Sequence, residues 1–195
     1  MAFIEPIPEE DAEGATAEMY AADLDEDGYV ANSTKAFGHR PAVFAAWRQL
    51  GSTIGGSMDR RRYELATVAA ARVLRSSYCS LAHGKVLAEQ FLGAERTIAL
   101  ATGAVDALDP LDAEIVRFAT LVTTEPASVT ASDVERLRAL GLSDEEILDV
   151  VLAAAARCFF STVLEALGVQ ADPAYGALDP ELRAALTVGR PIQEG

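Results

Sequence analysis

The feature that most constrains the fold is the long apolar run Ile147–Leu167, near the C-terminal end of the chain. Charged residues interrupt this run, among them Asp149 and Arg157. A membrane-spanning helix carries charged side chains only at a high cost in free energy. The run therefore predicts a buried helix in a helical core, and we expect no membrane partner.

Helix start signals recur along the sequence and favour an all-α fold. Asp59 is a good N-cap, and Ser143 with Glu146 forms a capping box. Pro41 and Pro110 are placed for the first turns of two further helices. No alternating run of apolar and polar residues predicts a strand, and the sequence holds no tandem repeat. We predict a helical bundle of roughly eight helices with short connections.

Length and composition favour one domain. The chain has 195 residues, and 50% of them are hydrophobic. We expect a single all-helical domain over residues 1–195, with its core at 41–169. A helix at 9–24, interrupted by Gly14, should pack on this core, as should a turn-rich tail at 170–195 with one short helix.

Charge and cysteine content argue against several classes of partner and location. The net charge of -14 and the pI near 4.5 disfavour nucleic acid and anionic membrane surfaces, which attract clustered Lys and Arg. The opening MAFIEPIPEEDAEG is acidic where a signal peptide carries a basic patch. The two cysteines, without an export signal, indicate free thiols in a reducing compartment. We expect a cytoplasmic protein.

An acidic stretch near the N-terminus matches part of a calcium-binding loop. Asp23, Asp25, Asp27 and Gly28 occupy its positions 1, 3, 5 and 6. The position of the bidentate Glu is Thr34, so too few fixed oxygen ligands remain. We interpret the stretch as a solvated turn, and we expect no metal and no cofactor.

Two further residues are interpreted as structural. His39 precedes a proline and is expected in a loop or at a helix entry, although it could line a cleft. Cys158 lies among apolar residues and is expected to be buried and unreactive.

The stretch SSYCSLAHGK holds the candidate chemistry. If a helix begins at Tyr78, the side chains of Cys79 and His83 lie one turn apart on the same face. The start of a helix favours a thiolate, and an imidazole can take the proton of the thiol. Glu64 stands in an Ala-rich stretch whose other residues are expected to be buried. It is a candidate to orient the imidazole of His83. This spacing fits a catalytic thiol, and it also fits two ordinary helix residues.

Glu64 is followed by fourteen residues and then by Cys79 and His83. This spacing resembles the motif of the alkylhydroperoxidase D / carboxymuconolactone decarboxylase superfamily. The segments HRPAVFAAWRQL and GLSDEEILDVVLAAAARCFFSTVLEALGV resemble flanks of its peroxidase-related branch, so the resemblance covers about 41–169. It implies an all-helical fold that forms homo-oligomers, often dimers, trimers or hexamers. In peroxidase-active members the cysteine matching Cys79 attacks the peroxide, and the residues matching His83 and Glu64 belong to a proton relay.

The chain departs from those members at two positions. The second cysteine of the family, three positions before the attacking one, is Ser76 here, and a further relay histidine is Tyr78. An oxidised Cys79 would therefore stop at the sulfenic acid unless an external small thiol, a thiol protein or Cys158 reduces it.

These observations predict a cofactor-free, peroxidase-like antioxidant oxidoreductase that reduces organic hydroperoxides through Cys79. One alternative is a carboxymuconolactone decarboxylase-like acid–base enzyme that uses His83 and Glu64 without the sulfur. Another is a non-catalytic helical oligomer with a binding or sensing role. In each case we expect a homo-oligomer, because long apolar helices present more apolar surface than one small bundle can bury.

Overall fold

The computed structural model describes residues 2–195, and all of the regular secondary structure in this part of the chain is helical. The all-α prediction is therefore confirmed over these residues. Met1, which the expected domain includes, lies outside them. The α-helices are α1 (Gly14–Asp27), α2 (Asn32–Ala36), α3 (Pro41–Ser57), α4 (Arg60–Val73), α5 (Ser77–Leu87), α6 (Gly93–Thr102), α7 (Pro110–Thr124), α8 (Ala131–Ala139), α9 (Asp144–Ala166) and α10 (Pro180–Leu186). The shorter turns are η1 (Glu9–Asp11), the π-helical η2 (Ala88–Leu92), η3 (Val105–Ala107), η4 (Pro126–Ser128) and η5 (Pro173–Ala177).

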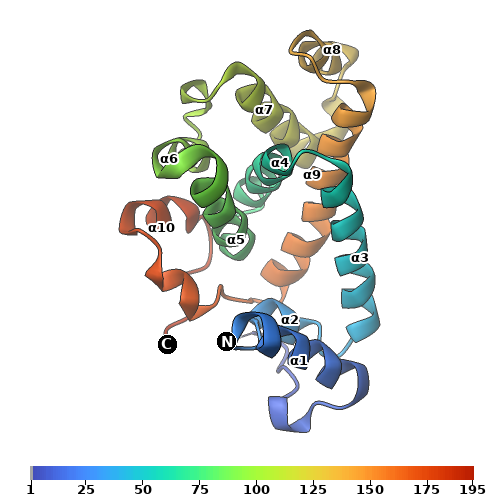
Figure 1. The fold of residues 1–195 in the computed structure, drawn as a ribbon, viewed down its shortest axis with the longest axis vertical. Coiled ribbons are helices and arrows are strands. Elements are labelled where there is room, and N and C mark those ends of the chain that lie inside the picture. Colours follow the sequence, from blue (N-terminus) through green and yellow to red (C-terminus); the bar gives the residue numbers. More distant parts are fainter. Residues whose placement is uncertain (1) are drawn as a thin grey trace.

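The core forms around α4. This helix packs against α5, α7 and α9, which lie around it in Figure 1. Every residue from Tyr63 to Ala71 is buried, because the alanines in this stretch allow neighbouring helices to approach closely on several sides. A polar side chain on α4 must therefore find its partners inside the bundle.

The predicted helix starts are confirmed. The Asp59 carboxylate accepts a hydrogen bond from the backbone N–H of Arg62 at 3.0 Å. Ser143 and Glu146 satisfy each other's backbone N–H groups at the start of α9. Pro41 and Pro110 are the first residues of α3 and α7.

The helices of the structure differ from the predicted ones in some of their bounds. The helix expected at 9–24 is wrong, since a single turn at η1 precedes α1, and α1 begins at Gly14 with φ +54°. Gly93, with φ +78°, ends the helical run that starts with α5, and α6 begins at the same residue. The short α2 was not predicted from the sequence.

Helix α9 is long and apolar enough to cross a membrane by length and composition alone. In the structure, 44% of its most apolar stretch is buried, against α3, α4 and α7. Its other side is open, where Leu148, Leu152 and Phe159 are exposed. The predicted buried helix is thus confirmed for one face only.

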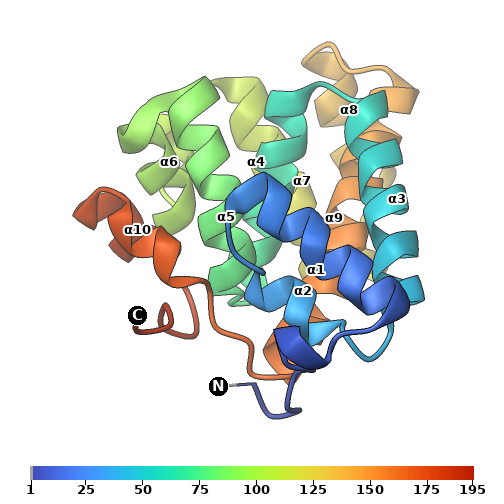
Figure 2. The ribbon, with the colours of Figure 1, turned by 60° about the horizontal axis from the view of Figure 1, so that its bottom comes forward.

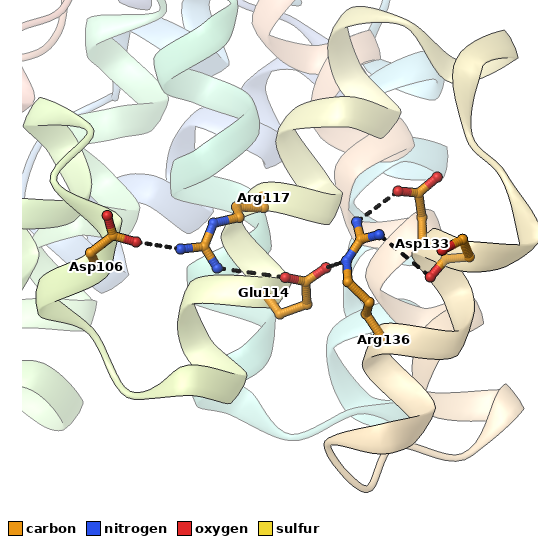
Figure 3. Close-up of polar contacts among 6 residues, drawn as sticks. Asp106, Glu114, Arg117, Asp133 and Arg136 are labelled. Carbon is orange, nitrogen blue, oxygen red and sulfur yellow. Dashed lines mark hydrogen bonds and ion pairs between the residues drawn. The ribbon is translucent and has the colours of Figure 1, made fainter.

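The two ends of the bundle are built differently. At one end, α1 and α2 lie with the chain termini, and Figure 2 shows α1 across the face between α5 and α3. At the other end, α8 is joined to α7 by an ion pair between the buried Glu114 and the half-exposed Arg136 (Figure 3). The candidate site lies toward the first end.

Candidate functional site

A tight turn between α4 and α5 places the candidate cysteine. The backbone N–H of Ser76 donates to the carbonyl of Ala71 at 2.9 Å, and that of Arg75 donates to Arg72 at 3.1 Å. Arg75 has φ +54°, so these bonds form a left-handed helix cap, occupied here by a residue other than glycine. Because the link is short, Cys79 falls in the first turn of α5, where the helix dipole favours negative charge.

The structure brings Glu64 and His83 into contact. His83 Nδ1 lies 2.6 Å from Glu64 Oε2, and Arg60 Nη2 lies 2.6 Å from Glu64 Oε1. The carboxylate has no exposed surface, so the Arg60 guanidinium and the His83 imidazole supply the partners that a buried charge needs. The ring of Tyr63 meets the imidazole edge-on with 5.9 Å between centroids, which further fixes the orientation of His83.

Burial determines the charge of His83. Desolvation lowers the pKa of this imidazole, and the positive charge of Arg157 lowers it further, while the bond to Glu64 opposes both. The neutral form therefore dominates at pH 7. With the carboxylate on Nδ1, the proton sits on Nδ1 and donates to Glu64, which leaves Nε2 as a hydrogen-bond acceptor.

Cys79 has a charged partner that sequence reasoning missed. Its side chain is buried, and Arg157 Nη1 donates to Cys79 Sγ at 3.5 Å. A guanidinium at this distance stabilises negative charge on sulfur, as does the start of α5. The expected pairing of Cys79 with His83 is not a direct hydrogen bond in residues 2–195, where the polar contact to the sulfur comes from Arg157.

Arg157 is held by aromatic rings and not by a carboxylate. Its guanidinium carbon lies 5.6 Å from the ring centroids of both Trp47 and Phe160. Over residues 2–195, no carboxylate lies within ion-pair distance of this side chain, and its buried Nε has no hydrogen-bond partner. The sequence did carry a signal for this residue, because a lone cation inside an apolar helix requires a partner.

These groups meet at a cavity of about 750 Å³. Cys79 and His83 on α5 and Arg157 on α9 line it, whereas Glu64 is fully buried and reaches it through His83. Aromatic side chains form much of the wall, namely Tyr29, Phe44, Trp47, Tyr78, Phe160 and Tyr175. The volume and the mixed lining are typical of a site for a small organic molecule.

Tyr78, which directly precedes Cys79, has a structural role. Its hydroxyl donates to the Asp172 carboxylate and accepts from the backbone N–H of Ser33 at 3.4 Å. Burial and the charge of Asp172 raise the pKa of Tyr78, so the phenol keeps its proton. It ties the segment that follows α9 to α5.

The other residues singled out in the sequence lie outside this chemistry. His39 is exposed, and its Nε2 lies 3.0 Å from the carbonyl of Glu5. The acidic stretch that begins at Asp23 forms the last turns of α1 and not a loop, with Gly28 as the C-cap at φ +79°. The expectation that Cys158 is buried is wrong, because it is partly exposed beside the open face of α9.

Comparison with known proteins identifies the fold. No family model matches the chain, and no curated protein matches it. Among solved structures, it is similar to an alkylhydroperoxidase AhpD core, an uncharacterised peroxidase-related protein from Ralstonia eutropha JMP134. The TM-score is 0.79 at 21% identity, over 97% of this chain and 98% of the other.

Two further solved structures share this architecture. A peroxidase-related protein from Silicibacter sp. TM1040 has a TM-score of 0.75 at 20% identity, over 90% of this chain and 91% of the other. The debrominase Bmp8, as a cysteine-to-alanine variant with 2,3,4-tribromopyrrole, has a TM-score of 0.70 at 16% identity, over 94% and 95%. The chain thus has the AhpD-like helical fold, a fold found in proteins named for different activities.

Proposed function

We propose that this protein is a cytoplasmic thiol oxidoreductase that reduces organic hydroperoxides through Cys79. The observation that carries the proposal is the contact between Arg157 Nη1 and Cys79 Sγ, at the wall of a cavity that His83 also lines. A sulfur that can hold negative charge beside an open cavity has the two properties that a thiol nucleophile needs, since the thiolate is the reactive form.

The first step is attack of the Cys79 thiolate on the terminal oxygen of the hydroperoxide. A sulfur–oxygen bond forms and the oxygen–oxygen bond breaks, so that Cys79 becomes a sulfenic acid and the remainder leaves as an alkoxide. The alkoxide then takes a proton and departs as an alcohol. Neutral His83 can accept the thiol proton on Nε2 and return it to the alkoxide, with Glu64 stabilising the imidazolium between the two transfers. Arg157 is placed to stabilise the negative charge throughout.

The second half-reaction needs an external thiol. Position 76 is a serine, and both cysteines of the chain are free thiols in the structure. The sulfenic acid therefore condenses with an external thiol to give a mixed disulfide and water, and a second external thiol releases Cys79 as a thiol. In total, one hydroperoxide and two thiols give one alcohol, one water and one disulfide.

The experiment that tests this proposal uses the two cysteines as a matched pair. Wild type exposed to one equivalent of cumene hydroperoxide, and then to dimedone, should carry the sulfenic acid adduct on Cys79 by mass spectrometry. Cys158→Ser should behave as wild type, and Cys79→Ser should neither form the adduct nor consume hydroperoxide. Absence of the adduct from wild type would contradict the proposal. An aryl bromide belongs in the same panel, because one fold neighbour is named a debrominase.

A second candidate function uses His83 and Glu64 without the sulfur. The 2.6 Å contact between them favours it, since a neutral imidazole held by a carboxylate is also a general base for decarboxylation of a lactone acid. The two candidates give opposite results for one variant. Cys79→Ser abolishes turnover of a hydroperoxide in the first case and leaves turnover of a lactone acid intact in the second.

We further propose that the protein is a homo-oligomer that forms through the open side of α3 and α9. Exposed apolar residues gather on these helices, at Val43 and Leu50 of α3 and at Leu148, Leu152 and Phe159 of α9. The Phe159 ring also packs on Trp47, a wall residue of the cavity, at 5.7 Å. A second copy on this face would bury apolar surface and support that wall. A monomeric mass by light scattering at micromolar concentration would contradict this assignment.

A further inference from the structure

Among the described residues, the polar side-chain contact of Arg157 is to the sulfur of Cys79. The residue is 5% exposed, its Nη1 contacts Cys79, and its Nε has no partner. No carboxylate among the described residues pairs with it, unlike the similarly buried Glu64 and Glu114, which have ion-pair partners. A buried charge without a partner is strongly unfavourable, so the state of the sulfur decides how the guanidinium is compensated.

In the form of the oxidised site that reacts with a thiol, the sulfur carries no negative charge for Arg157. The sulfenic acid that reacts with a thiol must carry its proton, because the oxygen leaves as water. A protonated sulfenic acid is neutral, so Arg157 then faces the cavity as an uncompensated cation at 3.5 Å from the sulfur position. Within a cavity walled by Trp47 and Phe160, a small anion with an apolar body would satisfy both the charge and the rings.

We infer that the oxidised site binds a small carboxylate on Arg157, and that the thiol that reduces Cys79 is therefore a low-molecular-weight thiol bearing a carboxylate. This inference rests on the proposed function for its reacting group, and it selects between the two classes of reductant expected from the sequence. A thiol protein is disfavoured because Cys79 is only 1% exposed, which leaves no surface for a protein cysteine to reach.

Charges at the rim of the cavity do not provide an equivalent cation. Arg48 lies 4.0 Å from Asp23 and 3.9 Å from Glu26, so its charge is already shared between two carboxylates. Lys85 and Glu89 of α5 and η2 bring one charge of each sign to the same rim. The rim is acidic on balance and slows the entry of anions at low salt, so the tests belong at ~0.15 M salt, where such exposed charges are screened beyond about 8 Å.

A binding experiment tests the anion site apart from catalysis. Cys79→Ser represents the neutral state of the sulfur, and Cys79→Asp places a permanent anion beside Arg157. Benzoate is the probe, and fluorescence of Trp47, the single tryptophan of the chain, is the signal. Cys79→Ser should bind benzoate about tenfold or more tightly than Cys79→Asp, and than Cys79→Ser combined with Arg157→Met. Benzamide, the neutral analogue, should show no such difference.

A kinetic experiment tests the reductant. Wild type is oxidised with one equivalent of hydroperoxide, and loss of the sulfenic acid is followed with 3-mercaptopropionate or 2-mercaptoethanol at equal thiolate concentrations. The carboxylate-bearing thiol should react about tenfold faster with wild type, and this preference should vanish in Arg157→Met.

The two experiments separate this inference from the proposed function. If no sulfenic acid forms in wild type, the proposed function fails. If it forms, the carboxylate inference is overturned by either of two results: benzoate binds the three variants equally or not at all, or the two thiols react at the same rate with wild type. The binding result stands even if Arg157→Met does not fold, because Cys79→Ser and Cys79→Asp both retain Arg157.

Discussion

Two buried glutamates, on the adjacent helices α4 and α7, are each held by two nitrogen-bearing side chains. Glu114 on α7 lies 2.7 Å from Arg136 of α8 and 3.5 Å from Arg117 (Figure 3). Glu64 on α4 lies 2.6 Å from both Arg60 and His83. Both carboxylates are almost completely withdrawn from solvent, so burial alone does not distinguish a structural ion pair from a candidate site.

The difference lies in the partners. Arginine stays protonated at every pH that proteins tolerate, so the pairs at Glu114 cannot transfer a proton. Histidine can gain and lose a proton near neutrality, and His83 also opens onto a cavity beside Cys79. The comparison teaches that a buried carboxylate is equipped to serve a proton relay only when one of its partners can titrate and opens onto a cavity.

The largest effect is expected from removing the titratable partner. His83→Ala should lower kcat/KM for a hydroperoxide by about 10²- to 10⁴-fold, the usual contribution of a general base. The matched control is Arg136→Ala, which removes a cationic partner of Glu114 and should leave kcat/KM unchanged. A similar loss of activity in both variants would show that the two clusters do not differ in function.

Removing the carboxylate is expected to have the next largest effect on activity. Glu64→Gln keeps the size of the side chain but loses the charge that orients and stabilises the imidazole, so kcat/KM should fall about 10- to 100-fold. It should not abolish activity, because Glu64 acts through His83 and does not touch the substrate. Glu114→Gln is the control, and steady-state kinetics on both variants should show a loss in Glu64→Gln only.

Much of this arrangement was predictable from local patterns. The capping box at Ser143 and the N-cap at Asp59 act through neighbours in the sequence, and the E-x14-C-x3-H order spans two consecutive helices joined by a short turn. The contact between Arg157 and Cys79 was not, because it joins residues 78 positions apart and depends on how α9 crosses α5. The exposure of Cys158 was missed for the same reason. Periodicity identifies an apolar helix, but it does not say which of its faces the bundle covers.

For stability the order of the two glutamates reverses, and Glu114 should matter more than Glu64. Glu114→Ala leaves Arg117 and Arg136 without their shared partner and should lower the free energy of unfolding by about 1–2 kcal/mol, a modest value because both arginines are roughly half exposed. Urea denaturation followed by circular dichroism measures this change. The loss should shrink in high salt, and an unchanged midpoint would indicate that these pairs contribute nothing to the joint between α7 and α8.

The smallest effect, and the one that most directly separates the clusters, concerns the charge of His83. Burial and Arg157 hold its pKa below the usual 6.5, so between that lowered pKa and 6.5 the unfolded chain binds more protons than the folded one. This group therefore makes stability fall as the pH drops below 6.5, and the acid limb of kcat/KM should also lie below 6.5.

Glu64→Gln should lower the pKa of His83 further, because the carboxylate stabilises the imidazolium, and Arg157→Met should raise it. NMR titration of the imidazole measures both shifts, with His39→Gln assigning the resonance. Shifts of the opposite sign would show that the charges of Glu64 and Arg157 do not control the proton on His83.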